Sequence, residues 1–311
     1  MMGEGAMRGL FIDANGALEA VFRAILRPGD PPVDVSGVED VSPDDLPRLL
    51  RGYDFALDDH SAMPAEAVAQ CEGLRHVIFL GTGARSYMDP EALARLGVQV
   101  HTIKGYGDTA VAEHAAALMF AAARDLAAMD RAVRAGEWPR TEGRQLLGKR
   151  LGLLGFGGIA AELARIGRGI GMEVLAWNRT ARTAEGVRFV PLDELLAASD
   201  VLSLHLLLTD ETRGFLGRDR IGQLKPGAIL VNTARAALVD EAAMIEALRS
   251  GRLAHAALDV FNEEPLPPGH PLTALPNVTL SAHSAFRTPE ASETLLRRAM
   301  DIARRIAGHR G

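Results

Sequence analysis

A single cysteine, Cys71, is found among the 311 residues of the chain. One thiol cannot form an internal disulfide, and the absence of a second cysteine or a cluster of conventional ligands argues against a structural zinc site. The N-terminal segment MMGEGAMRGLFIDANG has no basic region followed by a long apolar stretch, so we expect no signal peptide. Both features are typical of a protein of the reducing cytoplasm.

The sequence also lacks an excess of positive charge and a long uncharged apolar segment. Its 34 Lys and Arg residues face 40 Asp and Glu residues, for a formal net charge of −6. With no surplus of cations to neutralise phosphates, we expect no nucleic-acid partner. The most apolar segment, 109–129, carries Glu113, His114, Arg124 and Asp125. We therefore expect a buried interdomain helix there and no association with a membrane.

Apolar strand-like segments alternate with helical patterns along two successive stretches of the chain. A length of 311 residues is too great for one ordinary core, so we expect two domains. Strands are expected at 8–14, 53–58, 75–80 and 98–103, and then at 151–154, 173–178, 201–206, 228–233, 255–260 and 278–283. Helices are expected near 16–26, 64–72, 192–199 and 240–250, with another that ends near 169. This alternation predicts an α/β protein with two Rossmann-like or flavodoxin-like domains, each with a parallel sheet.

The last expected helix, 288–308, indicates how the two domains are connected. It begins with Thr288 as N-cap and Pro289 at the first helical position. We expect this helix to fold back onto the N-terminal segment. The dinucleotide-binding domain, 102–285, would then be inserted into a substrate-binding domain made of residues 1–101 and 286–311.

A glycine-rich turn follows the expected strand 151–154. Gly155 permits a tight turn, Gly157 lets the backbone approach a pyrophosphate, and Ala160 is small enough for the next helix to pack closely on the strand. The N-terminus of that helix offers free N–H groups and a partial positive charge. The turn therefore predicts dinucleotide binding by Gly155, Phe156, Gly157, Gly158 and Ile159.

The end of the next strand bears on the choice of cofactor. NAD sites usually hold Asp or Glu there to bind the ribose hydroxyls, whereas this chain has Asn178, Arg179 and Thr180. Without a carboxylate, nothing repels a 2′-phosphate, and Arg179 can pair with it through charge-assisted hydrogen bonds. We therefore expect NADP(H), with NAD(H) as the alternative if Arg179 is only an exposed loop residue.

Three polar side chains each follow an apolar strand-like segment in the second half of the chain: Arg235, Glu264 and His283. A hydride delivered from nicotinamide to a carbonyl carbon leaves an alkoxide, which a protonated His283 can protonate. A neighbouring Glu264 would orient the imidazole and favour its charged form. Arg235 can bind a substrate carboxylate and polarise the carbonyl. The set predicts an oxidoreductase for small 2-keto or 2-hydroxy acids.

The sequence around these residues resembles the D-isomer-specific 2-hydroxyacid dehydrogenase family, which includes glyoxylate/hydroxypyruvate reductases and phosphoglycerate dehydrogenases. The resemblance covers about 75–290 and is carried by HLLLTDETRG (205–214), LKPGAILVNTARAALVDE (224–241), ALDVFNEEPL (257–266) and PNVTLSAH (276–283). It implies that Arg235 binds substrate, that His283 is the acid/base, and that Glu264 is its carboxylate partner.

The resemblance implies further contacts with the cofactor. Asp259 would lie near the nicotinamide, and Leu207, where the family often has proline, would line the adenine pocket. Thr233 and Ala234, just before Arg235, would also contact the cofactor.

Two other segments take their expected roles from the resemblance. Leu80, Gly81, Thr82 and Gly83 resemble the loop whose backbone N–H groups hold the substrate carboxylate, and glycine permits such close approach. The segment around 120–147 would mediate a homodimer.

Some positions depart from the family pattern and leave the substrate open. The segment Gly83-Ala84-Arg85-Ser86 lacks an acidic residue often found beyond the substrate loop, and the loop is one residue longer. Arg85 either adds positive charge near the substrate or faces solvent, and Phe286 is a candidate for shaping the pocket.

Two alternative functions remain open at this point. A formate dehydrogenase is disfavoured, because formate oxidation has no substrate oxygen to deprotonate and so has no use for a carboxylate that polarises His283. A cofactor-sensing, corepressor-like protein would bind the cofactor without significant turnover. The presence of Arg235, Glu264 and His283 together favours an enzyme over such a sensor.

Overall fold

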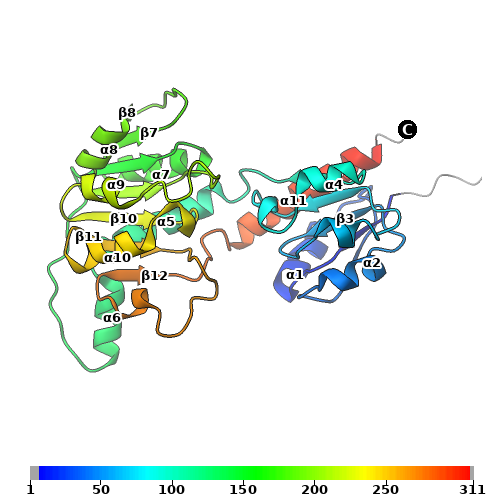
Figure 1. The fold of residues 1–311 in the computed structure, drawn as a ribbon, viewed down its shortest axis with the longest axis horizontal. Helices are drawn as coiled ribbons and strands as arrows, with labels where there is room; N and C mark the ends of the chain where they lie inside the picture. Colours follow the sequence, from blue (N-terminus) through cyan, green and yellow to red (C-terminus); the bar gives the residue numbers. More distant parts are fainter. Residues whose placement is uncertain (1–6, 309–311) are drawn as a thin grey trace, which may run out of the picture. The chain divides into compact units, whose positions relative to one another are not determined.

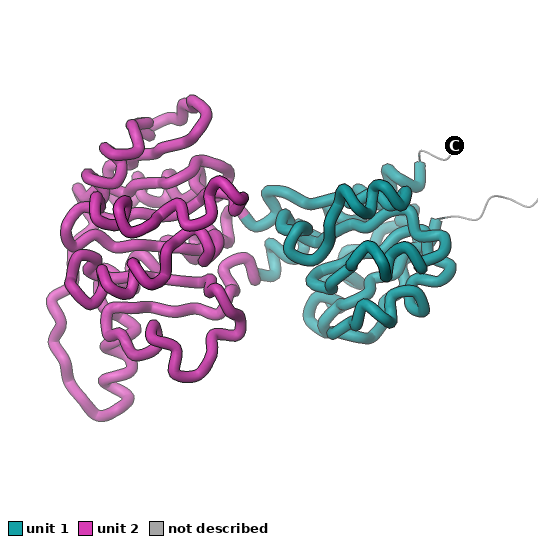
Figure 2. Tube along the Cα trace, viewed as in Figure 1, with its two compact units in different colours: residues 1–107, 288–311 teal, residues 108–287 magenta. Residues whose placement is uncertain are grey.

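The computed structural model describes residues 7–308 and forms two compact α/β units (Figure 2). Unit 1 comprises residues 1–107 and 288–311, and unit 2 comprises 108–287. The chain passes from one unit to the other after Gly107 and returns after Arg287, where we expected boundaries at 101 and 285. Residues 1–6, on which the expectation about a signal peptide partly rests, lie outside the described residues.

Unit 1 contains a five-stranded parallel sheet in the order β2-β1-β3-β4-β5 (Figure 1). Side chains alternate along each strand, so Phe11 and Leu57 enter one apolar core while Leu10 and Ala56 enter the other. Helices α1 and α11 cover the first face, and α2, α3 and α4 cover the second. The strands are β1 (Gly9–Phe11), β2 (Val33–Val35), β3 (Phe55–Asp58), β4 (His76–Phe79) and β5 (Gln99–Thr102), and the helices are α1 (Gly16–Ile25), α2 (Leu46–Leu49), α3 (Ala65–Val68), α4 (Pro90–Arg95) and α11 (Pro289–Gly308).

The C-terminal helix completes unit 1, as the sequence predicts. Thr288 Oγ1 accepts a hydrogen bond from Ala291 N at 3.1 Å, which confirms the expected N-cap. The apolar face of α11, including Leu296 and Ala299, packs against α1 and the sheet. Segments from the two ends of the chain therefore share one core.

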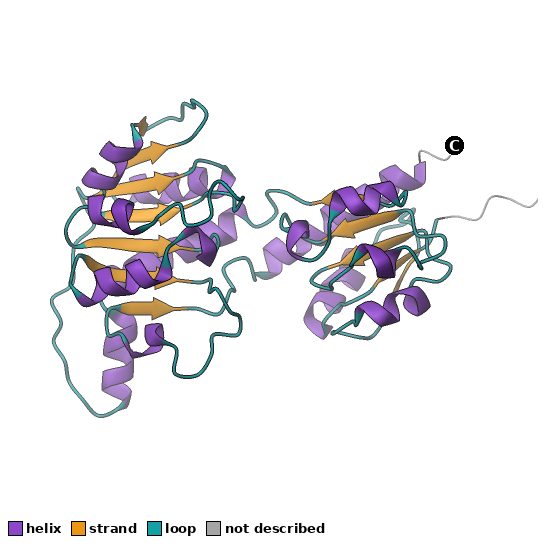
Figure 3. Ribbon diagram, viewed as in Figure 1, coloured by secondary structure: helices purple, strands orange, loops and turns teal. Residues whose placement is uncertain are grey.

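Unit 2 contains a seven-stranded parallel sheet in the order β12-β11-β10-β9-β6-β7-β8. Helices α5 and α7 cover one face of the sheet and α8, α9 and α10 cover the other (Figure 3). The strands are β6 (Arg150–Leu154), β7 (Glu173–Trp177), β8 (Val187–Phe189), β9 (Val201–Leu204), β10 (Ala228–Asn232), β11 (Leu253–Leu258) and β12 (Val278–Leu280). The helices are α5 (Asp108–Ala123), α6 (Leu126–Arg134), α7 (Gly158–Gly169), α8 (Leu192–Ala198), α9 (Arg218–Gln223) and α10 (Glu241–Arg249).

The topology of unit 2 indicates where a ligand binds. The chain proceeds from β6 to β7 and β8 on one side, then crosses to β9 and continues to β12 on the other. Open α/β sheets bind ligands outside the carboxyl ends of the strands at such a reversal of strand order. The expected α/β class with two parallel sheets is confirmed, and it directs attention to the loops after β6, β7, β9, β10, β11 and β12.

One expected helix is interrupted. Residues 109–129 form α5 and the start of α6, because Asp125 adopts the left-handed region with φ 52° and separates the two helices. The apolar residues of α5 pack inside unit 2 against α7, β10 and β11. No helix within residues 7–308 has both the length and the apolar character that crossing a bilayer requires.

Candidate active site

The glycine turn lies between β6 and α7, as the sequence predicts. Gly155 has φ +91°, and a Cβ there would lie 2.7 Å from the carbonyl oxygen of His205, so only glycine fits. Gly157 is exposed, with no atom within 4 Å of the position of a Cβ, which leaves its backbone open to a ligand. Ala160 is fully buried against the sheet. The start of α7 is thus open to a ligand at Gly157. At Gly158 the Asp108 carboxylate lies close by, and a Cβ there would clash with its Oδ2.

The remaining side chains of this turn are structural. Phe156 is buried, and its ring packs edge-to-face on Phe189 with centroids 5.1 Å apart. Ile159 is half-buried and packs against the same core. Asn178 Oδ1 accepts a hydrogen bond from Phe156 N at 3.2 Å and its amide donates to Thr180 O at 2.8 Å. Asn178 therefore ties the glycine turn to the end of β7.

Arg179 has a partner that the sequence did not reveal. Its guanidinium forms an ion pair with Glu211 at 2.9 Å, with the two side chains 81% and 77% exposed. Glu211 belongs to the loop after β9, which also carries the exposed Leu207. An ion pair this exposed contributes only about 0–1 kcal/mol, so another anion can displace Glu211 at little cost.

Two buried polar atoms lie at the carboxyl ends of neighbouring strands β9 and β10. Neither His205 Nε2 nor Thr233 Oγ1 has a hydrogen-bond partner among the described residues. Burial lowers the pKa of His205 to about 4, so the ring is neutral at pH 7. Buried polar groups are nearly always satisfied, so these atoms fit a site that is completed by a polar ligand. Together with the open backbone at Gly157, they fit a bound dinucleotide.

Arg235 follows β10 through a short hydrogen-bonded turn. The buried Asn232 accepts from Ala234 N and donates to Arg235 O, both at 3.0 Å, and so fixes the chain as it leaves the strand. The guanidinium of Arg235 donates to Ala234 O at 2.7 Å. The side chain is half-buried, and within residues 7–308 it forms no ion pair. It is therefore available to an anionic ligand.

His283 and Glu264 are in direct contact. His283 Nδ1 lies 2.6 Å from Glu264 Oε2, while Glu264 Oε1 accepts from Phe261 N at 2.8 Å. Both oxygens of the Glu264 carboxylate thus have a partner. Because a carboxylate accepts hydrogen bonds, the contact places a proton on His283 Nδ1, and Nε2 is left for a substrate. The ring of Phe286 stands edge-to-face to His283 with centroids 6.4 Å apart. Arg235, Glu264 and His283 follow the adjacent strands β10, β11 and β12 at one edge of the sheet.

Asp259 holds the loop that carries His283. This fully buried carboxylate accepts from Ser281 Oγ at 2.6 Å, Ala285 N at 3.0 Å and Ser284 N at 3.1 Å. His114 Nε2 lies 3.4 Å from Asp259 and bonds to Ser281 at 2.9 Å.

The same carboxylate has an unusual acidity. Burial raises its pKa, but the hydrogen bonds from His114, Ser281, Ala285 and Ser284 outweigh that effect and lower the pKa of Asp259 to about 2. The carboxylate therefore stays ionised, with its contacts directed to the loop rather than to an open face of the site. The sequence singled out Asp259 but gave no sign of its links to Ser281 and Ala285.

The Leu80–Gly83 segment lies in unit 1, directly after β4. Leu80 N donates to Asp58 O at 2.7 Å and Gly81 N donates to Phe79 O at 2.8 Å, so these two donors are occupied. The N–H groups of Thr82 and Gly83 donate to no group among the described residues. Arg85 forms an ion pair with Glu91, and its side chain is 72% exposed.

Comparison with known proteins agrees with this geometry. Residues 116–285 match the family model for the NAD-binding domain of D-isomer specific 2-hydroxyacid dehydrogenases. The chain is 43% identical to a glyoxylate reductase of Aeropyrum pernix over 254 residues, which cover 78% of this chain and 75% of that protein.

Solved structures agree in the same way. A pyruvate reductase of Chlamydomonas reinhardtii has a TM-score of 0.87 at 28% identity, covering 98% of both chains. An acyclic imino acid reductase solved with NADPH and D-Arg has a TM-score of 0.80 at 26% identity, covering 93% of this chain and 94% of that one. The chain therefore belongs to the D-isomer-specific 2-hydroxyacid dehydrogenase family and is a nicotinamide-dependent oxidoreductase.

Proposed function

We propose that this enzyme reduces a small 2-keto acid, with glyoxylate and hydroxypyruvate as the first substrates to test, and that it prefers NADP(H). The observation that carries the proposal is the contact of 2.6 Å between His283 Nδ1 and Glu264 Oε2, beside a half-buried Arg235 without a carboxylate partner in the described residues. The relationship to a glyoxylate reductase supports this substrate class.

The proposed mechanism assigns one task to each side chain. When bound, the nicotinamide supplies the hydride that reaches the carbonyl carbon of the substrate. His283 donates a proton from Nε2 to the carbonyl oxygen, and in the reverse direction it accepts that proton. Glu264 holds Nδ1 and its negative charge stabilises the imidazolium. Arg235 binds the substrate carboxylate and polarises the carbonyl.

The residues proposed to hold the cofactor surround the carboxyl ends of β6, β7, β9 and β10. Backbone N–H groups of Gly157, Gly158 and Ile159 at the start of α7 would bind the pyrophosphate. Thr233 Oγ1 offers an unsatisfied polar atom. The other positions proposed to line the cofactor are Gly155, Asn178, Arg179, Thr180, Leu207 and Ala234, together with the backbone of Phe156. Asp259 is fully buried and would act near the nicotinamide by holding the loop 281–285.

In unit 1, the Leu80–Gly83 loop is proposed to bind the substrate carboxylate. Of the four residues in the Leu80–Gly83 loop, Thr82 and Gly83 have backbone donors that no described group uses. Two adjacent free N–H groups suit a carboxylate, because each oxygen can accept one of them.

Oxidation of reduced nicotinamide in the presence of a panel of 2-keto acids tests this function. We expect turnover with glyoxylate or hydroxypyruvate, and a higher kcat/KM with NADPH than with NADH. Tight binding of NADPH without turnover on any member of the panel would instead support the corepressor-like sensor. Turnover confined to formate and an oxidised nicotinamide would contradict the proposal.

A further inference from the structure

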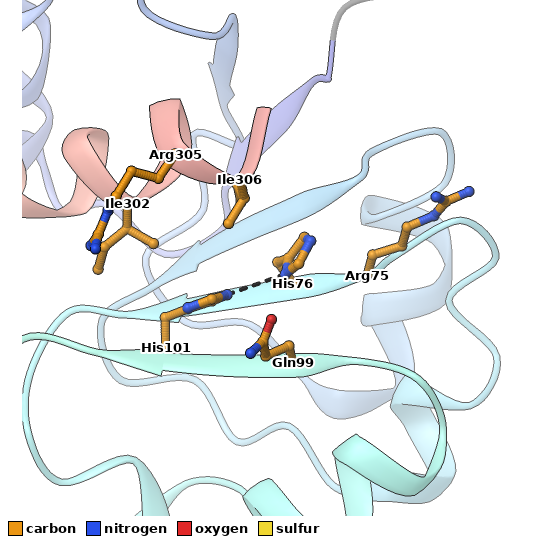
Figure 4. Close-up of a pocket in the computed structure, with 7 residues that line it drawn as sticks. All are labelled: Arg75, His76, Gln99, His101, Ile302, Arg305 and Ile306. Atoms are coloured by element: carbon orange, nitrogen blue, oxygen red, sulfur yellow. Dashed lines mark hydrogen bonds between the residues drawn. The ribbon is translucent and has the colours of Figure 1, made fainter. Parts of the chain in front are cut away.

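A cavity outside the proposed active site lies in unit 1, toward the amino end of β4. The Leu80–Gly83 loop follows the carboxyl end of the same strand, so the two places are separated along β4. The cavity measures about 450 Å³, within the range of about 300–1,000 Å³ that is usual for small-molecule sites. Its polar lining comes from β4, β5, α11 and the residue before β4: Arg75, His76, Gln99, His101 and Arg305 (Figure 4).

The ionisable side chains that line this cavity are all basic. Two arginines and two histidines line the cavity, and none of the described residues that line it is acidic. His76 Nδ1 and His101 Nε2 lie 3.1 Å apart and share a hydrogen bond, with Arg75 and Arg305 on either side of the pair in Figure 4. Burial, His76 and Arg305 together lower the pKa of His101, as expected where positive charges gather.

The cavity also has an apolar wall. Ile302 and Ile306, one turn apart on α11, face the histidine pair from the other side. Arginine binds phosphate oxygens with two parallel N–H groups, and imidazole adds further donors. A free inorganic ion would leave the isoleucines without a contact. Guanidinium and imidazole donors beside an apolar surface instead suit an organic molecule with an anionic end.

We propose that this cavity binds a phosphate monoester of a small organic molecule. The phosphate lies against the His76–His101 pair and Arg305, with Arg75 adding positive charge at the rim. The organic part packs on Ile302 and Ile306. This second site is independent of the hydride-transfer reaction, because none of its residues belongs to the proposed active site.

Isothermal titration calorimetry of the full chain tests the proposal with phenyl phosphate, inorganic phosphate and phenol as probes. Saturating NADPH is included, so that phosphate groups do not compete for the glycine turn. We expect binding of phenyl phosphate, weaker binding of inorganic phosphate and none of phenol. Equal affinity for the two phosphates would overturn the assignment of an ester, and no binding of either would overturn the site.

Variants locate the binding. Arg305→Gln is expected to weaken phenyl phosphate at least about tenfold, because a charge-assisted hydrogen bond is lost at an exposed side chain. Arg51→Gln, which changes another exposed arginine of unit 1, is the matched control and should bind as the wild type does. Loss of binding in Arg235→Ala would assign the probe to the active site and refute the proposal.

NMR spectroscopy of the wild-type enzyme tests the same site without any substitution. Addition of phenyl phosphate to the wild-type enzyme should shift the imidazole NMR signals of His76 and His101 while leaving that of His60, an exposed histidine of the same unit, in place. Unchanged signals of the His76–His101 pair at a saturating probe concentration would exclude the cavity.

Discussion

At the scale of single residues, two adjacent glutamates differ in their contacts. Glu264 contacts the His283 ring and Phe261 N, whereas Glu263 forms no hydrogen bond or ion pair among the described residues. Its position before Pro265 and its distance from Asp259 in the sequence favoured Glu264, and the geometry of the structure agrees with that choice.

This difference gives the first prediction. His283→Ala should lower kcat/KM by about 10²–10⁴-fold, because the carbonyl oxygen loses its proton donor. Glu264→Gln should also lower it, since the imidazolium loses its counter-charge. Glu263→Gln is the control and should retain wild-type kinetics. Steady-state kinetics at saturating NADPH check all three variants, with circular dichroism as the test of folding, and a fully active His283→Ala enzyme would refute the assignment.

Arg179 and Glu211 give the second prediction. Under the proposed preference for NADP(H), a 2′-phosphate would displace Glu211 from Arg179, so the carboxylate would oppose NADPH binding and the guanidinium would favour it. Arg179→Ala should lower kcat/KM for NADPH about tenfold or more and leave the value for NADH nearly unchanged. Glu211→Gln should raise the value for NADPH. If Arg179→Ala lowered kcat/KM equally for NADPH and NADH, Arg179 would not be the residue that recognises the 2′-phosphate.

At the scale of elements, the loop 281–285 depends on one carboxylate. His283 has φ 46°, a left-handed conformation that is strained for a residue with a side chain, and its N–H donates to Asp259 O at 2.8 Å. The Asp259 side chain binds the residues on either side of His283. The loop is therefore held in a conformation that it would not adopt by itself.

Acid stability provides the test of this role. The pKa of Asp259 falls from its ordinary value of 3.8 to about 2 on folding, which corresponds to about 2 kcal/mol of stability. Because the folded pKa is the lower one, this contribution is complete above pH 4 and is lost as the pH falls toward 2. Asp259→Asn should lower the unfolding free energy at pH 7 and flatten its decline between pH 4 and 2. Urea unfolding at several pH values measures both effects, and equal slopes in the two proteins would contradict the assignment.

The elements also show how far sequence patterns reach. Long apolar segments such as 228–233 and 255–260 became β10 and β11 within a few residues, because a strand buried on both faces has a continuous apolar sequence. The three-residue strands β2 and β8 and the short helices α2, α4 and α9 were not predicted. Elements this short hold fewer than two full periods of their pattern, so the pattern cannot be recognised and tertiary contacts fix them instead.

Some residues of the candidate site could likewise be identified from the sequence, whereas others could not. Glu264 and His283 have the sequence spacing of a known family, so both were identified. His114 contacts Ser281 across 167 positions, and Glu211 reaches Arg179 across 32, so only the fold brings these pairs together. The unsatisfied atoms of His205 and Thr233 depend on burial, which no local pattern specifies.

At the scale of the whole molecule, exposed apolar side chains concentrate in one segment. Phe120, Leu126, Val133, Trp138 and Leu147 are between 39% and 76% exposed, all within residues 120–147. Helix α6 and the long loop after it extend away from the sheet of unit 2 (Figure 1). An exposed apolar surface of this kind marks a protein–protein contact, and we propose that a second copy of the chain covers it in a homodimer.

Light scattering coupled to size exclusion tests the homodimer. The wild type should elute as a dimer, and the pair Leu126→Glu and Val133→Glu on α6 should shift it to a monomer, since two buried charges would face the partner. Leu96→Glu in unit 1 changes a leucine that is 45% exposed and should leave the dimer intact. A monomeric wild type at micromolar concentration would refute this proposal.

Unit 1 is built from two segments that are separated in the sequence by unit 2, and this order affects folding during synthesis. Its core needs α11 to pack on α1, although all of unit 2 lies between these two helices in the sequence. All the strands of unit 2 are synthesised before α11 and are contiguous in the chain, so unit 2 can fold while unit 1 still waits for its final helix. During that interval, the part of the unit 1 core that α11 covers remains exposed to solvent. Nascent chains released early would therefore carry a folded second unit and a first unit that chaperones and proteases can recognise.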